Sequence, residues 1–136
     1  MEPNNLLDID AILSEYQKDI EVDFKMDELT IKEKAMLAPV IKHKWVGRTT
    51  TRKLQLVRLN SMKKEEIKKL SGESPVPVSK AILDKIASDS EKIQKINEAI
   101  EKLEQLIVYL EKIEKVASSL TYDYKNVIDL QKLETT

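Results

Sequence analysis

The sequence has no cysteine, only two glycines and four prolines, and a single tryptophan and a single phenylalanine among 136 residues. The absence of cysteine excludes disulfides, thiolate metal sites and a cysteine nucleophile. Glycine and proline punctuate sheets and long loops, so their scarcity favours a helix-rich protein. No apolar run approaches the ~18 residues of a membrane-spanning helix, and the first ten residues lack the features of a signal peptide. We therefore expect a soluble, cytoplasmic protein that does not use a membrane.

Residues that carry catalytic chemistry are also scarce. The single histidine, His43, lies among Lys42, Lys44 and Trp45, without the partners that a metal site or a catalytic triad needs. Neither glycine belongs to a phosphate-binding loop of the G-x-x-x-x-G-K-[ST] type. The glutamates between 98 and 114 alternate with lysines, as on the solvated face of a helix. We expect no enzyme activity, no metal ion and no cofactor.

Negative charge is missing from the middle of the chain, although the whole chain carries a net charge of −1. Residues 1–33 contain ten acids and three lysines, and residues 70–136 contain twelve acids and nine lysines. Residues 34–69, in contrast, contain eleven lysines and arginines and two glutamates. From Lys34 to Lys64 there are nine basic residues and no acid. A merely solvated surface mixes both signs, so this segregation calls for a specific explanation.

A basic stripe between acidic flanks is typical of a polyanion site, and nucleic acid is the first polyanion to consider. Phosphates repel carboxylates, which explains the absence of acids along such a helix. The alternative is that the cations pair with the acidic N-terminal segment of the same chain or of a neighbour. Trp45 is either a core anchor or a stacking platform for an unpaired base. The candidate nucleic-acid-binding residues are Lys42, Lys44, Trp45, Arg48, Arg52, Lys53, Arg58, Lys63, Lys64, Lys68 and Lys69.

Apolar spacing in the N-terminal third predicts a short helix over about 9–18, with Asp8 as its N-cap. The residues "EVDF" (21–24) are expected to end it, and a weaker helical pattern follows up to Pro39. Proline is tolerated in a first helical turn, so Pro39 ends that helix or opens the next one.

A basic helix is expected from about 40 to 70. Gly47 and the threonines at 49–51 have poor helix propensity, which allows a kink or break there. The clearest loop is 71–79. It separates an N-terminal helical part, residues 1–70, from C-terminal oligomerisation helices, residues 80–136.

The C-terminal part contains the most regular pattern of the sequence. Ser88 and Glu91 fit a capping box that opens a long amphipathic helix. Six apolar residues follow one another at alternating steps of three and four, as in the seam of a coiled coil: Ile93, Ile96, Ile100, Leu103, Ile107 and Leu110. A second stretch of this seam, from Ile113 to Val127, follows after a shifted step, which indicates a stammer or a boundary between two helices near Ser118.

The seam is wider than a strict two-stranded coil requires, because Ala99 and Leu106 extend it sideways. Such a width favours a helical bundle or a higher oligomer. The predicted fold class is therefore all-α, with several helices and a long C-terminal helix that assembles a homo-oligomer. An intramolecular hairpin against residues 40–70 would also cover the seam.

Several strings resemble the UvsY family of phage recombination mediators: "YQKDIEVD" (16–23), "PVIKHKW" (39–45) and a basic helix that ends in "KKLSG" (68–72). In the C-terminal half, "IASDSEKIQKI" (86–96) and "YDYKNVID" (122–129) are similar to the family in layout. The resemblance spans nearly the whole chain. It implies an all-helical, ring-like homo-oligomer that binds single-stranded DNA and contacts the phage recombinase and the single-strand DNA-binding protein.

The resemblance also implies DNA contacts in the basic helix just before the turn, around Lys64. Two departures fall there: Glu66 stands where a basic residue is expected, and Lys69 and Leu70 replace an aromatic pair. Arg48, Arg52, Lys53 and Arg58 are then expected to carry more of the DNA contact. The predicted function is a non-enzymatic recombination mediator in the host cytoplasm. The alternative is a structural or adaptor coiled-coil protein whose basic helix pairs with acidic protein partners.

Overall fold

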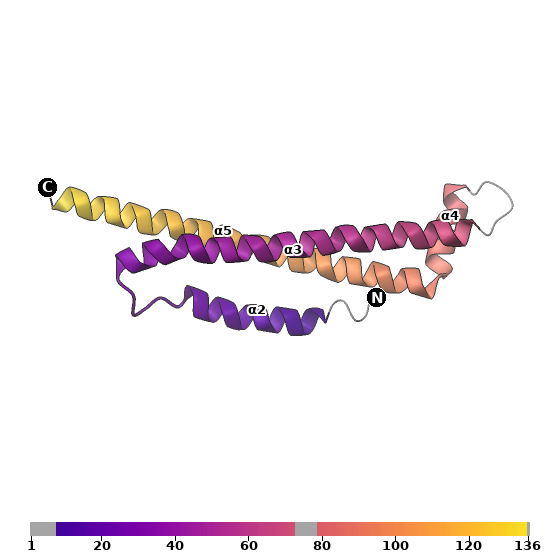
Figure 1. The fold of residues 1–136 in the computed structure, drawn as a ribbon, viewed down its shortest axis with the longest axis horizontal. Coiled ribbons are helices and arrows are strands. Elements are labelled where there is room, and N and C mark those ends of the chain that lie inside the picture. Colours follow the sequence, from indigo (N-terminus) through magenta and orange to yellow (C-terminus); the bar gives the residue numbers. More distant parts are fainter. Residues whose placement is uncertain (1–7, 73–78, 136) are drawn as a thin grey trace.

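The computed structural model describes residues 8–72 and 79–135, and within these ranges the chain forms four α-helices and no strand. Two long helices, α3 (Ile31–Ser71) and α5 (Glu91–Glu134), run antiparallel as a hairpin. Helix α2 (Ile9–Phe24) lies along one side of this hairpin, and α4 (Lys80–Asp89) crosses its closed end (Figure 1). The predicted all-α class is confirmed.

Helix α2 begins where the sequence predicts and ends later. The Asp8 carboxylate accepts a hydrogen bond of 3.1 Å from the Ala11 backbone N–H, which confirms the N-cap. The predicted end was wrong, because "EVDF" forms the last turn of the helix. Ile20 and Phe24 are four residues apart and both pack against the core, so apolar burial carries the helix through this turn.

Helix α3 is a single helix of 41 residues, and both interruptions considered from the sequence are absent from it. The helix starts after Thr30, whose hydroxyl caps the Glu33 N–H at 3.2 Å, and Pro39 lies inside it. Pro39 is therefore neither an end nor a beginning. Ala38 and Ile41 on either side of it are buried, so packing against the core holds this turn helical despite the missing N–H.

The threonine run does not break α3 either. The hydroxyls of Thr49, Thr50 and Thr51 each donate to the backbone carbonyl four residues earlier, at 2.9, 2.9 and 3.0 Å. In this way the side chains satisfy their own hydrogen bonds within the helix and do not compete with it. Gly47 has ordinary negative backbone φ and sits in a regular turn.

The predicted capping box at the start of α5 was wrong by two residues. The N-cap of α5 is Ser90, whose hydroxyl accepts from the Ile93 N–H at 3.3 Å. Ser88 instead belongs to α4, and its hydroxyl donates to the Lys85 carbonyl. Ser90 also ends α4 through a hydrogen bond from its N–H to the Ile86 carbonyl, so a single extended residue makes the corner.

Helix α5 is continuous through Ser118, so the shift in its seam is neither a helix boundary nor a break. Five of the six predicted seam residues are buried, and α5 packs mainly against α3. Leu103, Ile107 and Leu110 belong to the core cluster, and Ile100 is partly buried against it. The hairpin alternative is thus the arrangement within one chain. That these six side chains also form contacts between chains stays a prediction.

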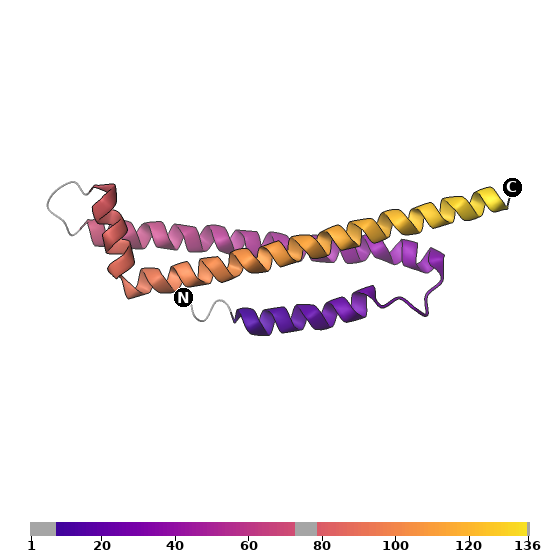
Figure 2. The same cartoon turned by 180° about the vertical axis from the view of Figure 1, so that it is seen from behind.

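The C-terminal part of α5 is the least covered part of the hairpin. No described residue after Ala117 is buried, and Tyr122, Val127 and Leu130 are exposed. Figures 1 and 2 both show the C-terminal end of α5 extending past the first turns of α3. Tyr124 still packs against the core, so the uncovered side of this segment is the one that carries Tyr122, Val127 and Leu130.

Candidate nucleic-acid interface

The cations of α3 fall into two sets, because successive side chains of a helix turn toward different neighbours. Lys44, Arg48 and Arg52 follow one another at steps of four, and each contacts α2. The side chains of the second set are exposed to solvent fully or in part. It consists of Lys42, Lys53, Arg58, Lys64, Lys68 and Lys69, which are exposed, and Lys63, which is half-buried.

Arg48 is the centre of the set that α2 covers. Its guanidinium carbon lies 4.6 Å from the ring centre of Trp45 and 5.0 Å from that of Tyr16, within cation–π range of both. Its Nη2 donates to the Asp19 carboxylate at 2.6 Å. This hydrogen bond, opposed by burial and aided by the charges of Arg48 and Lys44, lowers the pKa of Asp19 from its usual 3.8.

The two neighbouring cations are also held by α2. Lys44 Nζ donates to the Asp23 carboxylate at 3.0 Å, and Arg52 Nε donates to the Tyr16 hydroxyl at 3.0 Å. Arg52 also donates to the Gln55 side chain at 2.8 Å. The ion-pairing interpretation of the basic stripe therefore holds for Lys44. Among the described residues, the hydrogen-bond partners of Arg52 are both uncharged.

Trp45 is fully buried, which excludes base stacking in this conformation. Its ring meets Tyr16 edge-on, with the ring centres 5.6 Å apart and the planes at 79°. The indole N–H donates to the Asp23 carboxylate at 3.0 Å. The core-anchor interpretation is the one that fits, because α2 covers the ring face that a base would need.

The solvent-facing cations form a line along α3. Lys42, Lys53 and Lys64 are separated by 11 residues each, which is close to three helical turns and about 16 Å of rise. Lys53 pairs with Glu111 of α5 at 3.5 Å, with both side chains about half exposed. Such a surface pair contributes little and yields readily to a competing anion. Within the described residues, Lys42 and Lys64 have no ion-pair partner.

A stripe of apolar and small side chains runs beside this line, and the sequence analysis missed it. Arg58 and Lys69, again 11 residues apart, lie along its other border, and neither has an ion-pair partner in the described ranges. The sequence contains this stripe as residues at alternating steps of four and three, but polar residues at some of these positions interrupt the apolar pattern. The stripe consists of the exposed residues Met36, Val40, His43, Gly47, Thr50, Leu54, Val57 and Ser61.

We call the stripe and its two basic borders the open face of α3. From Lys34 to Lys64 the chain has no acid, so this stretch of α3 contributes cations, apolar groups and a few uncharged polar groups to the open face, and no carboxylate. Val40 and Val57 are 63% and 62% exposed, so the apolar groups are accessible as well. A surface of this kind suits a ligand with anionic and apolar parts, which a single nucleic-acid strand has.

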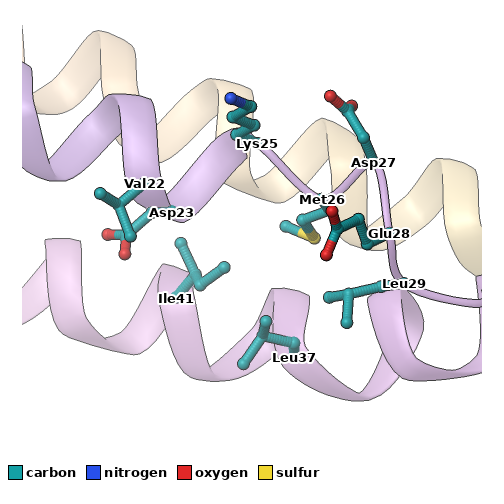
Figure 3. Close-up of a pocket in the computed structure, with 9 residues that line it drawn as sticks. All are labelled: Val22, Asp23, Lys25, Met26, Asp27, Glu28, Leu29, Leu37 and Ile41. Atoms are coloured by element: carbon teal, nitrogen blue, oxygen red, sulfur yellow. The ribbon is translucent and has the colours of Figure 1, made fainter.

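A separate hollow of about 530 Å³ lies where the chain turns from α2 into α3. Figure 3 shows the carboxylates of Asp23, Asp27 and Glu28 around it, together with Met26, and only Lys25 supplies positive charge. These carboxylates repel phosphates, so the hollow is unsuited to nucleic acid.

The described ranges contain neither a candidate metal site nor a membrane-spanning helix. No group of three or more histidine, cysteine, aspartate or glutamate side chains there is arranged to hold a metal ion. No helix of the described residues is long and apolar enough to cross a membrane.

Comparison with known proteins identifies one family. The family model described as "Recombination, repair and ssDNA binding protein UvsY" matches residues 15–136. No curated protein and no solved structure gives a match. The matched range includes all of α3, α4 and α5 and most of α2, and thus the whole open face.

Proposed function

The chain belongs to the UvsY family of recombination, repair and single-stranded-DNA-binding proteins, and on this premise we propose that it is a non-enzymatic recombination mediator. It binds single-stranded DNA and helps a phage recombinase to replace the single-strand DNA-binding protein. The observation that carries the DNA-binding step is the open face of α3, with its accessible cations and its acid-free length.

The proposed binding mode follows from the layout of the open face. Phosphates lie along the borders, where Lys42, Lys53 and Lys64 form one row and Arg58 and Lys69 the other. Bases lie across the apolar and small side chains between the rows. Contacts of this kind do not read base edges, so binding should tolerate any sequence and depend strongly on salt.

Assembly into a homo-oligomer, ring-like as the family resemblance implies, would multiply these weak contacts through effective concentration. We propose that the C-terminal part of α5 makes the main contact between chains. Tyr122, Val127 and Leu130 are exposed there, whereas the predicted seam from Ile93 to Leu110 is already packed within the chain. Many weak contacts suit a mediator, because a strand held in this way can be passed to the recombinase piece by piece.

The test of mediation measures recombinase ATPase activity on single strands that are pre-coated with the cognate single-strand DNA-binding protein. Adding this protein should shorten the lag or raise the rate. A variant with reduced charge on the open face should fail to do so, although it remains folded. No rescue by the wild type, with all partners taken from the same phage, would refute mediation even if DNA binding survives.

The adaptor alternative has one observation in its favour. Lys44 and Arg48 pair with acids of α2, and Lys53 pairs with Glu111 of α5, so acidic side chains of other helices do satisfy part of the basic surface of α3. A gel-shift assay with single-stranded oligonucleotides at low and moderate salt separates the two. Absence of a shift at low salt would favour the adaptor.

A further inference from the structure

A shallow groove of about 480 Å³ runs between α2 and α3 and adjoins the open face at Gly47. Three cations and one acid line it, and its wall includes a glycine. A Cβ atom placed at Gly47 would meet nothing within 4 Å, so the space above this backbone is open. The lining consists of Glu15, Tyr16, Lys44, Gly47, Arg48, Thr51 and Arg52.

Arg48 is held in this groove with part of its hydrogen-bonding capacity unused. The rings of Trp45 and Tyr16 fix the guanidinium in place without neutralising it. Nη2 binds the Asp19 carboxylate, whereas Nη1 is buried and has no hydrogen-bond partner among the described residues. A guanidinium fork matches the oxygens of a phosphate through two parallel hydrogen bonds, so this arginine is incompletely satisfied by its present partner.

Asp19 can leave Arg48 without undocking α2. Its side chain is 32% exposed where it meets Arg48, so a rotation about its own bonds carries it into solvent. Helix α2 would remain attached through the buried Tyr16 and through the hydrogen bond from Trp45 to Asp23. Lys44 and Arg52, one turn to either side of Arg48, would then face the same space.

We infer that Asp19 occupies Arg48 in place of a phosphate, and that the α2–α3 groove is a phosphate subsite for a single nucleic-acid strand. The strand enters by exchange: a phosphodiester replaces the Asp19 carboxylate on Arg48 while α2 stays docked. The inference rests on the proposed single-stranded-DNA binding. It adds a second binding site, the α2–α3 groove, and a residue, Asp19, that weakens DNA binding there. Asp19 thereby keeps binding loose, as a mediator requires.

The exchange has a distinct salt signature. When a phosphate binds a free cation, the strand releases condensed counterions. In the wild type the displaced Asp19 carboxylate takes up a cation in turn, which offsets that release. In Asp19→Asn the release is not offset, so the slope of log affinity against log salt should steepen by about 0.7, and affinity at about 0.1 M salt should rise about fivefold.

The experiment measures binding of labelled oligothymidylate to the full chain across a salt series. Glu21→Gln is the matched control, because it removes one exposed acid from the same helix at a position with no hydrogen bond or ion pair to Arg48 in the described structure. Asp19→Asn should bind more tightly with the steeper slope, and Glu21→Gln should stay near the wild type. In an Arg48→Met background, which removes the cation, the Asp19→Asn change should have no effect. Circular dichroism confirms that each variant remains helical.

The fluorescence of Trp45, the only tryptophan, reports whether α2 stays in place. Its emission should change in intensity when the oligonucleotide binds, without the red shift of a water-exposed indole. A red shift with strong acrylamide quenching would overturn the exchange, because it means that α2 departs. Equal affinities and slopes for the wild type and Asp19→Asn would also overturn it, with DNA binding intact. If the wild type fails to bind oligothymidylate at low salt, the proposed function itself is refuted.

Discussion

Charge removal on the open face of α3 gives the sharpest test of where DNA binds. The variant combines Arg58→Gln, Lys64→Gln and Lys69→Gln, three exposed side chains without ion-pair partners in the described ranges. Glutamine has nearly the helix propensity of lysine and arginine, so α3 should persist. If each side chain contacts one phosphate, the slope of log affinity against log salt falls by about 2.1.

The size of the effect follows from this slope. Affinity should drop about 50-fold at about 0.15 M salt, about 500-fold at about 0.05 M and only about fourfold at about 0.5 M. The difference between variant and wild type must therefore shrink as salt rises. Fluorescence anisotropy with labelled oligothymidylate measures both proteins over the same series.

The control removes the same charge from α5, with Lys95→Gln, Lys102→Gln and Lys112→Gln. All three side chains are exposed on α5 and none forms an ion pair with the described residues of α3; Lys95 pairs with Glu91 of its own helix. This control should lose little affinity and keep the wild-type slope. Equal losses in the two triple variants would refute the localisation to the open face, because only net charge would then matter. An unchanged affinity in the α3 variant would favour the adaptor alternative.

Four further outcomes concern stability, assembly and pH. Gly47→Ala should raise the free energy of unfolding by about 0.5–1 kcal/mol in urea titration, because the helix gains a better former and the new Cβ meets no atom; a loss would contradict the regular helix at this turn. Leu110→Ala should lower it by about 2–5 kcal/mol because the side chain is fully buried. Leu130→Ala should change it by less than about 0.5 kcal/mol but reduce the mass seen by light scattering, and an unchanged mass would place assembly elsewhere. The depressed pKa of Asp19 means that its pairing with Arg48 stabilises the fold at neutral pH and is lost as pH falls below the usual 3.8; Asp19→Asn should therefore destabilise the protein at pH 6, with the difference vanishing in strong acid.

Local features of the chain were predictable from the sequence because they depend on neighbours in the chain. The N-cap at Asp8 was found because a short acidic side chain just before an apolar periodic segment satisfies the first free N–H groups. The basic segment was correctly assigned to a helix. Its continuity through Pro39 and Gly47 was not predicted, because packing of Ala38, Ile41 and Trp45 outweighs poor local propensity.

The candidate site shows the same division. Composition alone identified an acid-free stretch of cations, and helical periodicity contained the open stripe, although the polar positions within it concealed the pattern. Neither could assign Arg48 to a groove and Lys64 to solvent. That difference arises because α2 folds back over one side of α3 and brings Asp19 and Asp23 to cations more than twenty residues away.

The sequence by itself determined that the chain is helical, that its charge is segregated and that α5 carries an apolar seam. Each of these follows from side-chain chemistry at spacings within one helix. Only the tertiary structure decided that the seam is covered by the chain's own α3, that Trp45 is buried and that one set of cations is paired with α2. The choice depends on competition among distant surfaces for the same apolar and charged partners, and helical periodicity describes each surface without specifying its partner.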